Sequence, residues 1–344
     1  MIKYTLKVLK IKKETEDAVT VCFKQPSLKK IKYQAGQYLT LIFRINGRRY
    51  IRPYSFSSAP NVDSLLEVTV KKVPNGIVSN YINKNIKVDD IVEVLQPMGD
   101  FILPNDKKYK NIFLWGVGSG VTPLFSLLKF ILNEDVLNES YVHLIYGNHT
   151  IESSIFWNPL HVLQEKNSNR FQITHFHTRS ELNEDINLSS KGRIQPDIVL
   201  ANYSPEEITA SLHYICGPAD LKRNIKTLLN TYNIDESQIL SEDFELVKDP
   251  KEFIGIVTQR ITLDFNNEVI GLEVEEGKSI LEAALDMDLE LPYSCQTGNC
   301  DTCKATLEKG KAKMIGIQNR EDLLEKEFLL CCTYPITEDV YIKL

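Results

Sequence analysis

Four cysteines late in the chain have a spacing that can bind an iron–sulfur cluster. Cys295, Cys300 and Cys303 follow the pattern C-x4-C-x2-C, and Cys331 comes after a long gap. Thiolates at this spacing are the ligands of a plant-type [2Fe–2S] cluster. Structural zinc is the alternative, but it usually uses two closely spaced cysteine pairs. The sequence therefore predicts a one-electron carrier in this part of the chain.

The spacing leaves two residues open as the fourth ligand, because Cys331 and Cys332 are adjacent. A glycine inside the motif, Gly298, lets the backbone approach the inorganic sulfides. Backbone amides in such a loop can donate hydrogen bonds to the sulfur atoms and tune the cluster potential.

A second motif, at residues 52–58, gathers a cation, an aromatic ring and hydroxyl groups on one expected strand. A flavin nucleotide needs all three. The guanidinium of Arg52 suits a pyrophosphate, the ring of Tyr54 can stack on the isoalloxazine, and the hydroxyl of Ser55 can lie near the flavin N5. Core packing is the alternative interpretation of the aromatic residues.

A third motif, Gly116, Gly118 and Gly120, follows an apolar run, and Pro123 is expected at the first helical position after it. A tight turn is the alternative for a glycine-rich segment. A strand before the motif and a proline at the start of a helix favour a dinucleotide site instead. The glycines allow the backbone to approach a pyrophosphate, which then lies at a helix N-terminus.

Together these motifs resemble the ferredoxin–NADP reductase superfamily, and the resemblance covers nearly the whole chain. It implies a flavin, usually FAD, with FMN as the alternative, and it implies a nicotinamide nucleotide. The cofactor-binding residues that it implies are Arg52, Pro53, Tyr54, Ser55, Gly76, Ile77, Val78 and Ser79 for the flavin, and Gly116, Gly118, Ser119, Gly120, Thr122, Pro123, Cys216, Gly217 and Pro218 for the nucleotide.

The same resemblance identifies residues near the reacting rings. Cys216 lies in a Cys-Gly-Pro element that the superfamily places beside the nicotinamide and the flavin. Glu242 begins an acidic-x-Phe element that closes the domain near the flavin. With Tyr54 and Ser55, these two residues are the expected catalytic set. Resemblance to plant-type ferredoxins assigns the fourth cluster ligand to Cys331. Cys332 is then its neighbour, facing the other side of an expected strand.

The choice of nucleotide depends on two loops. Relatives that use NADPH often have an arginine where this chain has His149, and Arg179 is the expected substitute. We favour NADPH over NADH. His175 and His177 alternate on an expected strand; we interpret them as packing residues, with a metal pair as the alternative.

The elements that must position these residues change in kind along the chain. Short alternating runs at residues 2–8, 19–23, 38–43, 65–73 and 91–95 predict an antiparallel barrel. Apolar strands then alternate with helical stretches, which predicts a doubly wound parallel α/β sheet. Ser279 and Glu282 form a capping box that opens a later helix. The expected domains are an FAD-binding β-barrel (1–104), an NAD(P)-binding domain (105–246), a linker (247–256) and a β-grasp 2Fe-2S ferredoxin domain (257–344).

Composition limits the class of protein. The chain has 344 residues and a net charge of −6, which argues against nucleic acid as a partner. Residues 257–344 hold nine Lys/Arg and seventeen Asp/Glu, so the acidity is concentrated in the expected ferredoxin domain. The apolar run at 112–132 is broken by glycines and Pro123, which argues against membrane insertion. Seven cysteines, four of them in one motif, indicate no secreted disulfide framework, and we expect a cytoplasmic protein.

The domain order resembles the reductase components of multicomponent oxygenases. It implies an NAD(P)H-dependent oxidoreductase that passes electrons through FAD and the cluster to an oxygenase component. A general electron-transfer reductase for a desaturase, a hydroxylase or a separate carrier is the alternative. A reductase of the flavohaemoglobin type is disfavoured, because no globin-like segment precedes the barrel. The sequence leaves the terminal acceptor and the oligomeric state open.

Overall fold

The computed structural model describes residues 2–26, 30–104, 109–133, 139–179, 189–246, 248–317 and 320–344. The expected domain boundary at residue 105 and the start of the expected linker at residue 247 lie outside these ranges. The chain divides into two compact units. One comprises Met1–Leu41 and Tyr54–Asp243, and the other comprises Ile42–Pro53 and Phe244–Leu344.

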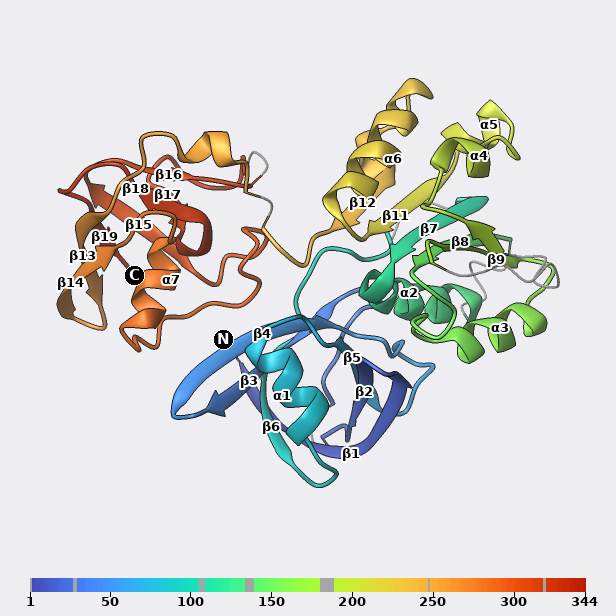
Figure 1. Cartoon of the computed structure of the whole chain (residues 1–344), viewed down its shortest axis with the longest axis horizontal. Helices are drawn as coiled ribbons and strands as arrows, with labels where there is room; N and C mark the ends of the chain where they lie inside the picture. The colour runs from blue at the N-terminus through green and yellow to red at the C-terminus, as the bar shows by residue number, and fades with distance from the viewer. Residues whose placement is uncertain are drawn as a thin grey trace. The chain divides into compact units, whose positions relative to one another are not determined.

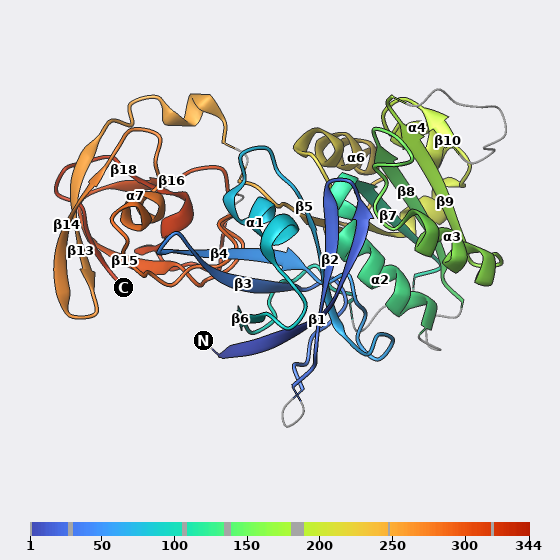
Figure 2. The ribbon, with the colours of Figure 1, turned by 60° about the horizontal axis from the view of Figure 1, so that its bottom comes forward.

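The first sheet is the expected antiparallel structure, a curled sheet in the order β4-β3-β6-β1-β2-β5. The long strand β1 pairs with β6 over its first half and with β2 over its second half, which lets the sheet curl. Helix α1 (Ile77–Asn85) lies beside β5 (Figure 2). The strands are β1 (Lys3–Thr15), β2 (Ala18–Phe23), β3 (Tyr38–Ile45), β4 (Arg48–Ser55), β5 (Leu66–Lys71) and β6 (Ile91–Leu95).

The second sheet is parallel throughout, in the order β10-β9-β8-β7-β11-β12. Figure 1 labels its strands except β10, which Figure 2 labels. The strand order reverses at β7, which has β8 on one side and β11 on the other. Ligands of doubly wound sheets bind outside the carboxyl ends of the strands at such a point. The strands are β7 (Asn111–Val117), β8 (Tyr141–Asn148), β9 (Phe171–His177), β10 (Ser189–Lys191), β11 (Leu212–Cys216) and β12 (Ile239–Glu242).

Helices cover both faces of this sheet, as near-continuous apolar strands require. One core contains Leu124 and Leu128 of α2 and Leu160 of α3, packed on one face. The other contains Leu200 of α4 and Ile225 of α6, packed on the opposite face. The helices are α2 (Val121–Asn133), α3 (Trp157–Lys166), α4 (Pro196–Leu200), α5 (Pro205–Thr209) and α6 (Ala219–Thr231).

The C-terminal part of the second unit is built on a five-stranded mixed sheet in the order β14-β13-β19-β15-β17. β13 pairs antiparallel with β14 and parallel with β19. Helix α7 (Ile280–Asp286) begins at Ser279 with the expected capping box. The remaining elements are η4 (Pro250–Phe253), β13 (Gln259–Phe265), β14 (Glu268–Val274), β15 (Lys304–Lys309), β16 (Ala312–Met314), β17 (Glu327–Leu329), η5 (Leu330–Cys332), β18 (Thr333–Pro335) and β19 (Tyr341–Lys343).

One helix starts earlier than the sequence predicts. A 3-10 turn, η1 (Gly118–Gly120), leads directly into α2 at Val121, so Pro123 is the third helical residue and not the first. The first-turn N–H groups of a helix have no partner within the helix, so a proline anywhere in that turn breaks no hydrogen bond.

Among the described residues, no helix is long and apolar enough to span a membrane.

Candidate functional site

Three expected site residues meet at the carboxyl edge of the parallel sheet. Gly116 at the end of β7 stands in register with Cys216 at the end of β11. Cys216 stands in register with Glu242 at the end of β12. Because neighbouring parallel strands end together, residues far apart in sequence form one row. This row lies at the switch point of the sheet.

The curled sheet contributes a hydroxyl to this row. Ser55, at the end of β4, is buried, and its Oγ donates a hydrogen bond to Glu242 Oε2 at 3.2 Å. Burial raises the pKa of the Glu242 carboxyl to about 8. Burial and the nearby Glu242 and Asp243 raise the pKa of Cys216, so the thiol is neutral at physiological pH. The site therefore presents a hydroxyl, a carboxyl group and a thiol, each carrying its proton at neutral pH.

The raised pKa of Glu242 has a consequence for stability. Between its ordinary value of 4.5 and about 8, the carboxyl is protonated in the folded protein and ionised in the unfolded chain. The folded state then binds the extra proton, so this group's contribution to stability falls as pH rises through that window. We expect Glu242→Gln to flatten the pH dependence of the melting temperature there.

Thermal unfolding of the wild type, Glu242→Gln and Glu165→Gln, measured from pH 5 to pH 9, checks this expectation. Glu165 is an exposed carboxylate of α3, so its variant should keep the wild-type slope. A Glu242→Gln curve parallel to the wild-type curve would show that the Glu242 carboxyl is ionised in the folded protein.

The glycine-rich turn lies beside the same row. The hydroxyl of Tyr146 donates to the Gly118 carbonyl at 3.1 Å, and Thr122 Oγ1 donates to the Ser119 carbonyl at 2.9 Å. A Cβ atom on Gly120 would lie 2.1 Å from the Cys216 carbonyl oxygen. The turn therefore packs backbone to backbone against the Cys-Gly-Pro element, where Pro218 caps helix α6.

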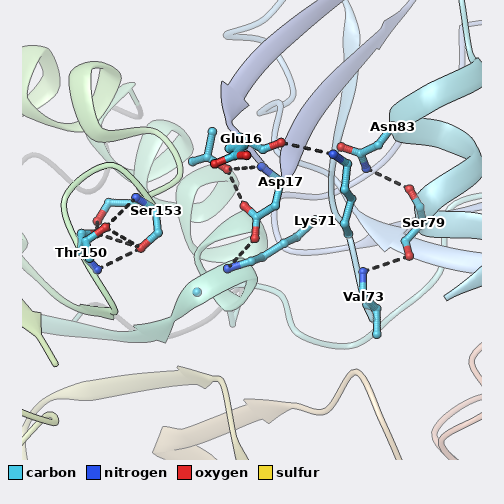
Figure 3. A network of polar contacts seen from close by, with 12 residues as sticks. Glu16, Asp17, Lys71, Val73, Ser79, Asn83, Thr150 and Ser153 are labelled. Atoms are coloured by element: carbon cyan, nitrogen blue, oxygen red, sulfur yellow. Dashed lines mark hydrogen bonds and ion pairs between the residues drawn. The ribbon is translucent and has the colours of Figure 1, made fainter. Parts of the chain in front are cut away.

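A helix N-terminus in the curled-sheet region suits the flavin phosphates. Gly76 precedes α1 and provides no side-chain cap, so a ligand can take the first-turn N–H groups. Ser79 is held in the first turn: its Oγ accepts from the Val73 N–H at 3.1 Å, and Asn83 donates to its carbonyl (Figure 3). Ile77 is half exposed beside the N-terminus, and Val78 is buried beneath it.

Two residues expected to bind the flavin, Arg52 and Pro53, belong to the second compact unit. Arg52 and Pro53 lie on β4 and are grouped with the second compact unit, whereas Tyr54 and Ser55 are grouped with the first. The Arg52 Nη1 donates to the Ile51 carbonyl at 2.8 Å. The roles of Arg52 and Pro53 toward the flavin phosphates stay predictions from the motif.

Two contacts that sequence reasoning missed join the flavin and nicotinamide regions into one unit. Ser126 of α2 donates to the Ser58 carbonyl at 2.6 Å. Lys129, one turn later, forms an ion pair with Asp63 at 2.5 Å. A serine and a lysine on a mostly apolar helix gave no indication of their partners, which lie 68 and 66 residues earlier in the chain.

The four expected cluster cysteines lie in the second unit. We call residues 295–303 the cysteine loop. Cys300 Sγ lies 3.1 Å from Cys295 Sγ, and the Thr297 N–H points at Cys295 Sγ at 3.4 Å. The thiol of Cys331 lies beside those of Cys295 and Cys303. Contacts with Cys300 and then Cys331 lower the pKa of Cys295, and the contact with Cys331 lowers the pKa of Cys303. The fold thus gathers four thiols from the loop and from η5.

The two candidates for the fourth ligand differ in their surroundings. We expected Cys331 and Cys332 on opposite faces of a strand; this is wrong, because the segment is the 3-10 helix η5, whose successive side chains are about 120° apart. Cys331 contacts thiols of the cysteine loop. Cys332 is fully buried and donates to the Leu329 carbonyl at 3.3 Å. The surroundings support Cys331 as the ligand.

The histidine pair packs in the core of the nicotinamide region. The rings of His175 and His177 stack 5.8 Å apart, next to Trp157. Burial lowers the pKa of His175 to about 3.

No group of three or more histidine, cysteine or acidic side chains in the described ranges has the arrangement of a metal-ion site. Ligation of the cluster therefore remains a prediction, supported by the gathering of the four thiols.

A parallel sheet with this switch point accepts a dinucleotide, and the residue row beside it is suited to hydride transfer to a flavin. A β-grasp unit with four gathered thiols is suited to one-electron transfer. Their presence in one chain defines an iron–sulfur flavoprotein reductase.

Comparison with known proteins agrees with this class. Family models match residues 5–102 as an oxidoreductase FAD-binding domain, 114–227 as an oxidoreductase NAD-binding domain and 265–336 as a 2Fe-2S iron-sulfur cluster binding domain. The chain is 30% identical to one component of the 1,2-phenylacetyl-CoA epoxidase of Escherichia coli, over 98% of this chain and 97% of that protein. It belongs to the family of ferredoxin–NADP reductase-type flavoproteins with a C-terminal 2Fe-2S ferredoxin domain.

Two further relatives extend the comparison. The ferredoxin reductase component of 3-ketosteroid-9-alpha-monooxygenase from Rhodococcus rhodochrous is 30% identical, over 98% of this chain and 96% of that protein. Phthalate dioxygenase reductase has the same fold: its structure matches with a TM-score of 0.69 and 22% identity, over 99% of this chain and 98% of that one. The chain is an oxidoreductase that uses FAD, a nicotinamide nucleotide and a 2Fe-2S cluster in electron transfer.

Proposed function

We propose that this chain is the reductase component of an oxygenase system and delivers electrons from NADPH to an oxygenase partner. The observation that carries the proposal is the extent of the match: relatives named as parts of oxygenase systems align over almost their whole length, ferredoxin domain included.

The proposed division of labour follows from the site. FAD, when bound, supplies the conversion of an electron pair into single electrons. Tyr54 is proposed to cover the flavin ring, and Ser55 is proposed to hold its hydroxyl near the ring while bonded to Glu242. Glu242 keeps a proton at neutral pH, so its carboxyl adds no negative charge beside Ser55. Cys216 keeps a neutral thiol, and its carbonyl oxygen lies beside the glycine-rich turn.

The proposed partner is an oxygenase component, and phenylacetyl-CoA epoxidase is the first to test. The Escherichia coli and Rhodococcus relatives are equally similar, yet their names give different substrates. Similarity therefore supports the class of acceptor more strongly than any one substrate. The excess of acid in residues 257–344 favours a partner with a basic docking face. We also propose that the protein works in the cytoplasm, where such a partner and the nucleotide pool are found.

The preference for NADPH rests on the loops after β8 and β9. His149 Nδ1 and Thr178 Oγ1 are 2.9 Å apart, and the Arg179 N–H donates to the His149 carbonyl at 2.9 Å. The backbone of the exposed Arg179 is thus bonded to the position where NADPH-using relatives often carry an arginine. A guanidinium there suits the 2′-phosphate that distinguishes NADPH from NADH.

An anaerobic titration tests the proposed function. Purified protein should show flavin bands overlaid on broad iron–sulfur absorption, and both should bleach on addition of NADPH. Adding the oxidised epoxidase components should restore the absorption. Failure to bleach with either nucleotide would contradict the reductase function. A kcat/KM for NADH well above that for NADPH would overturn only the nucleotide assignment.

A further inference from the structure

A guanidinium from outside the cysteine loop holds that loop at two points. Arg320 Nη1 donates to the Gly298 carbonyl oxygen at 2.6 Å, and Nη2 donates to Asp301 Oδ1 at 2.6 Å. Gly298 is two residues before Cys300, and Asp301 is the residue directly after Cys300. One side chain therefore binds the loop on both sides of an expected ligand: a main-chain carbonyl before Cys300 and a side-chain carboxylate after it.

Arg320 donates two further hydrogen bonds, both to Asp322. Nε and Nη2 bind the two carboxylate oxygens of Asp322, each at 2.7 Å. The Arg320 side chain is 19% exposed, whereas those of Asp301 and Asp322 are 54% and 58% exposed. A planar fork can serve a carbonyl and two carboxylates at once, and a lysine ammonium on its flexible stem has no equivalent fixed geometry.

The loop is closely packed where Arg320 holds it. Gly298 has φ +75, and a Cβ there would lie 2.2 Å from Ile317 Cγ2. In a trans peptide the carbonyl and the following N–H point in opposite directions. Fixing the Gly298 carbonyl toward Arg320 therefore directs the Asn299 N–H away from the guanidinium. That orientation leaves the N–H available to a sulfur atom.

We infer that Arg320 is a positioning residue for the [2Fe–2S] cluster, which sets the shape of the cysteine loop and raises the cluster's midpoint potential. The inference rests on the proposed ligands Cys295, Cys300, Cys303 and Cys331. A fixed loop binds the cluster at a smaller entropic cost. A nearby positive charge and oriented amide donors favour the more negative, reduced cluster.

Arg320→Ala in the full-length protein tests this inference. We expect cluster loss, followed by absorbance under chelator, to become about tenfold faster, as removal of hydrogen bonds from a charged group predicts. The midpoint potential, measured by redox titration with EPR detection, should become more negative. Arg320→Lys should recover much of the potential, because the charge remains, but little of the cluster retention.

Two further variants keep the test decisive. Arg260→Ala removes an exposed arginine of β13 in the same unit and should match the wild type in both measurements. If Arg320→Ala does not fold, Asp301→Ala removes one partner, and its cluster loss should still be faster. If a folded Arg320→Ala variant loses its cluster at the wild-type rate and has the wild-type midpoint potential, the inference about Arg320 is overturned, but the ligand assignment is not. A wild type that binds no iron and sulfide after reconstitution would overturn the ligand assignment as well.

Discussion

Cys300→Ser is expected to abolish cluster-dependent cytochrome c reduction while leaving flavin-dependent reduction of a two-electron dye. Cys300 is one of three thiols in the cysteine loop, and its Sγ contacts that of Cys295. A serine hydroxyl is a poor substitute for a thiolate toward iron, so the cluster should be lost. The flavin and nicotinamide residues Tyr54, Ser55 and Cys216 lie in the other compact unit and should keep their structure.

Parallel assays of both activities, with iron and sulfide analysis, check this result. Cys332→Ser is the matched control, because Cys332 is adjacent to the proposed fourth ligand and bonded to a backbone carbonyl. That variant should retain iron. Equal loss of both activities in Cys300→Ser would contradict the division of labour, and loss of iron in Cys332→Ser would reassign the fourth ligand.

Gly120→Ala is expected to impair reduction by NADPH severely while leaving the flavin bound. The added Cβ would lie 2.1 Å from the Cys216 carbonyl oxygen, so the glycine-rich turn or the Cys-Gly-Pro element must move. Overpacking of this kind typically costs about 1–3 kcal/mol of stability. A displacement of about 1 Å at a reacting geometry can lower the rate about a hundredfold.

Stopped-flow reduction of the flavin by NADPH, together with the melting temperature, checks this expectation. Gly271→Ala is the control, because nothing lies within 4 Å of the atom that it adds. It should reduce the flavin at the wild-type rate. A wild-type rate in Gly120→Ala would show that the close approach to Cys216 is not needed for hydride transfer.

Sequence reasoning succeeded where the chemistry is local. The glycine-rich turn and the Ser279 capping box depend on neighbouring residues, and the structure places the turn between β7 and α2 and the capping box at the start of α7. The alternation of strand and helix was enough to predict a parallel sheet. Its register, which aligns Cys216 with Glu242, shows that two weak motifs lie in one row.

Contacts between distant segments were not predictable. Nothing near Ser126 in sequence indicates that its hydroxyl binds the Ser58 carbonyl. Arg320 was missed for the same reason, because its acceptor is a main-chain carbonyl 22 residues away, and a carbonyl has no sequence signature. The 3-10 geometry of η5 was missed because a three-residue turn has too little periodicity to distinguish it from a strand.

The exposed loops after β8 and β9 bear on how this reductase can be redesigned. His149, Thr178 and Arg179 bond to one another at the surface, whereas Gly120 is wedged against the Cys216 backbone. The residues proposed to distinguish one nucleotide from another are thus separate from those proposed to position the reacting ring. We expect substitutions in the loops to exchange the coenzyme with little effect on the chemistry, and laboratory evolution of coenzyme use should accumulate its changes there.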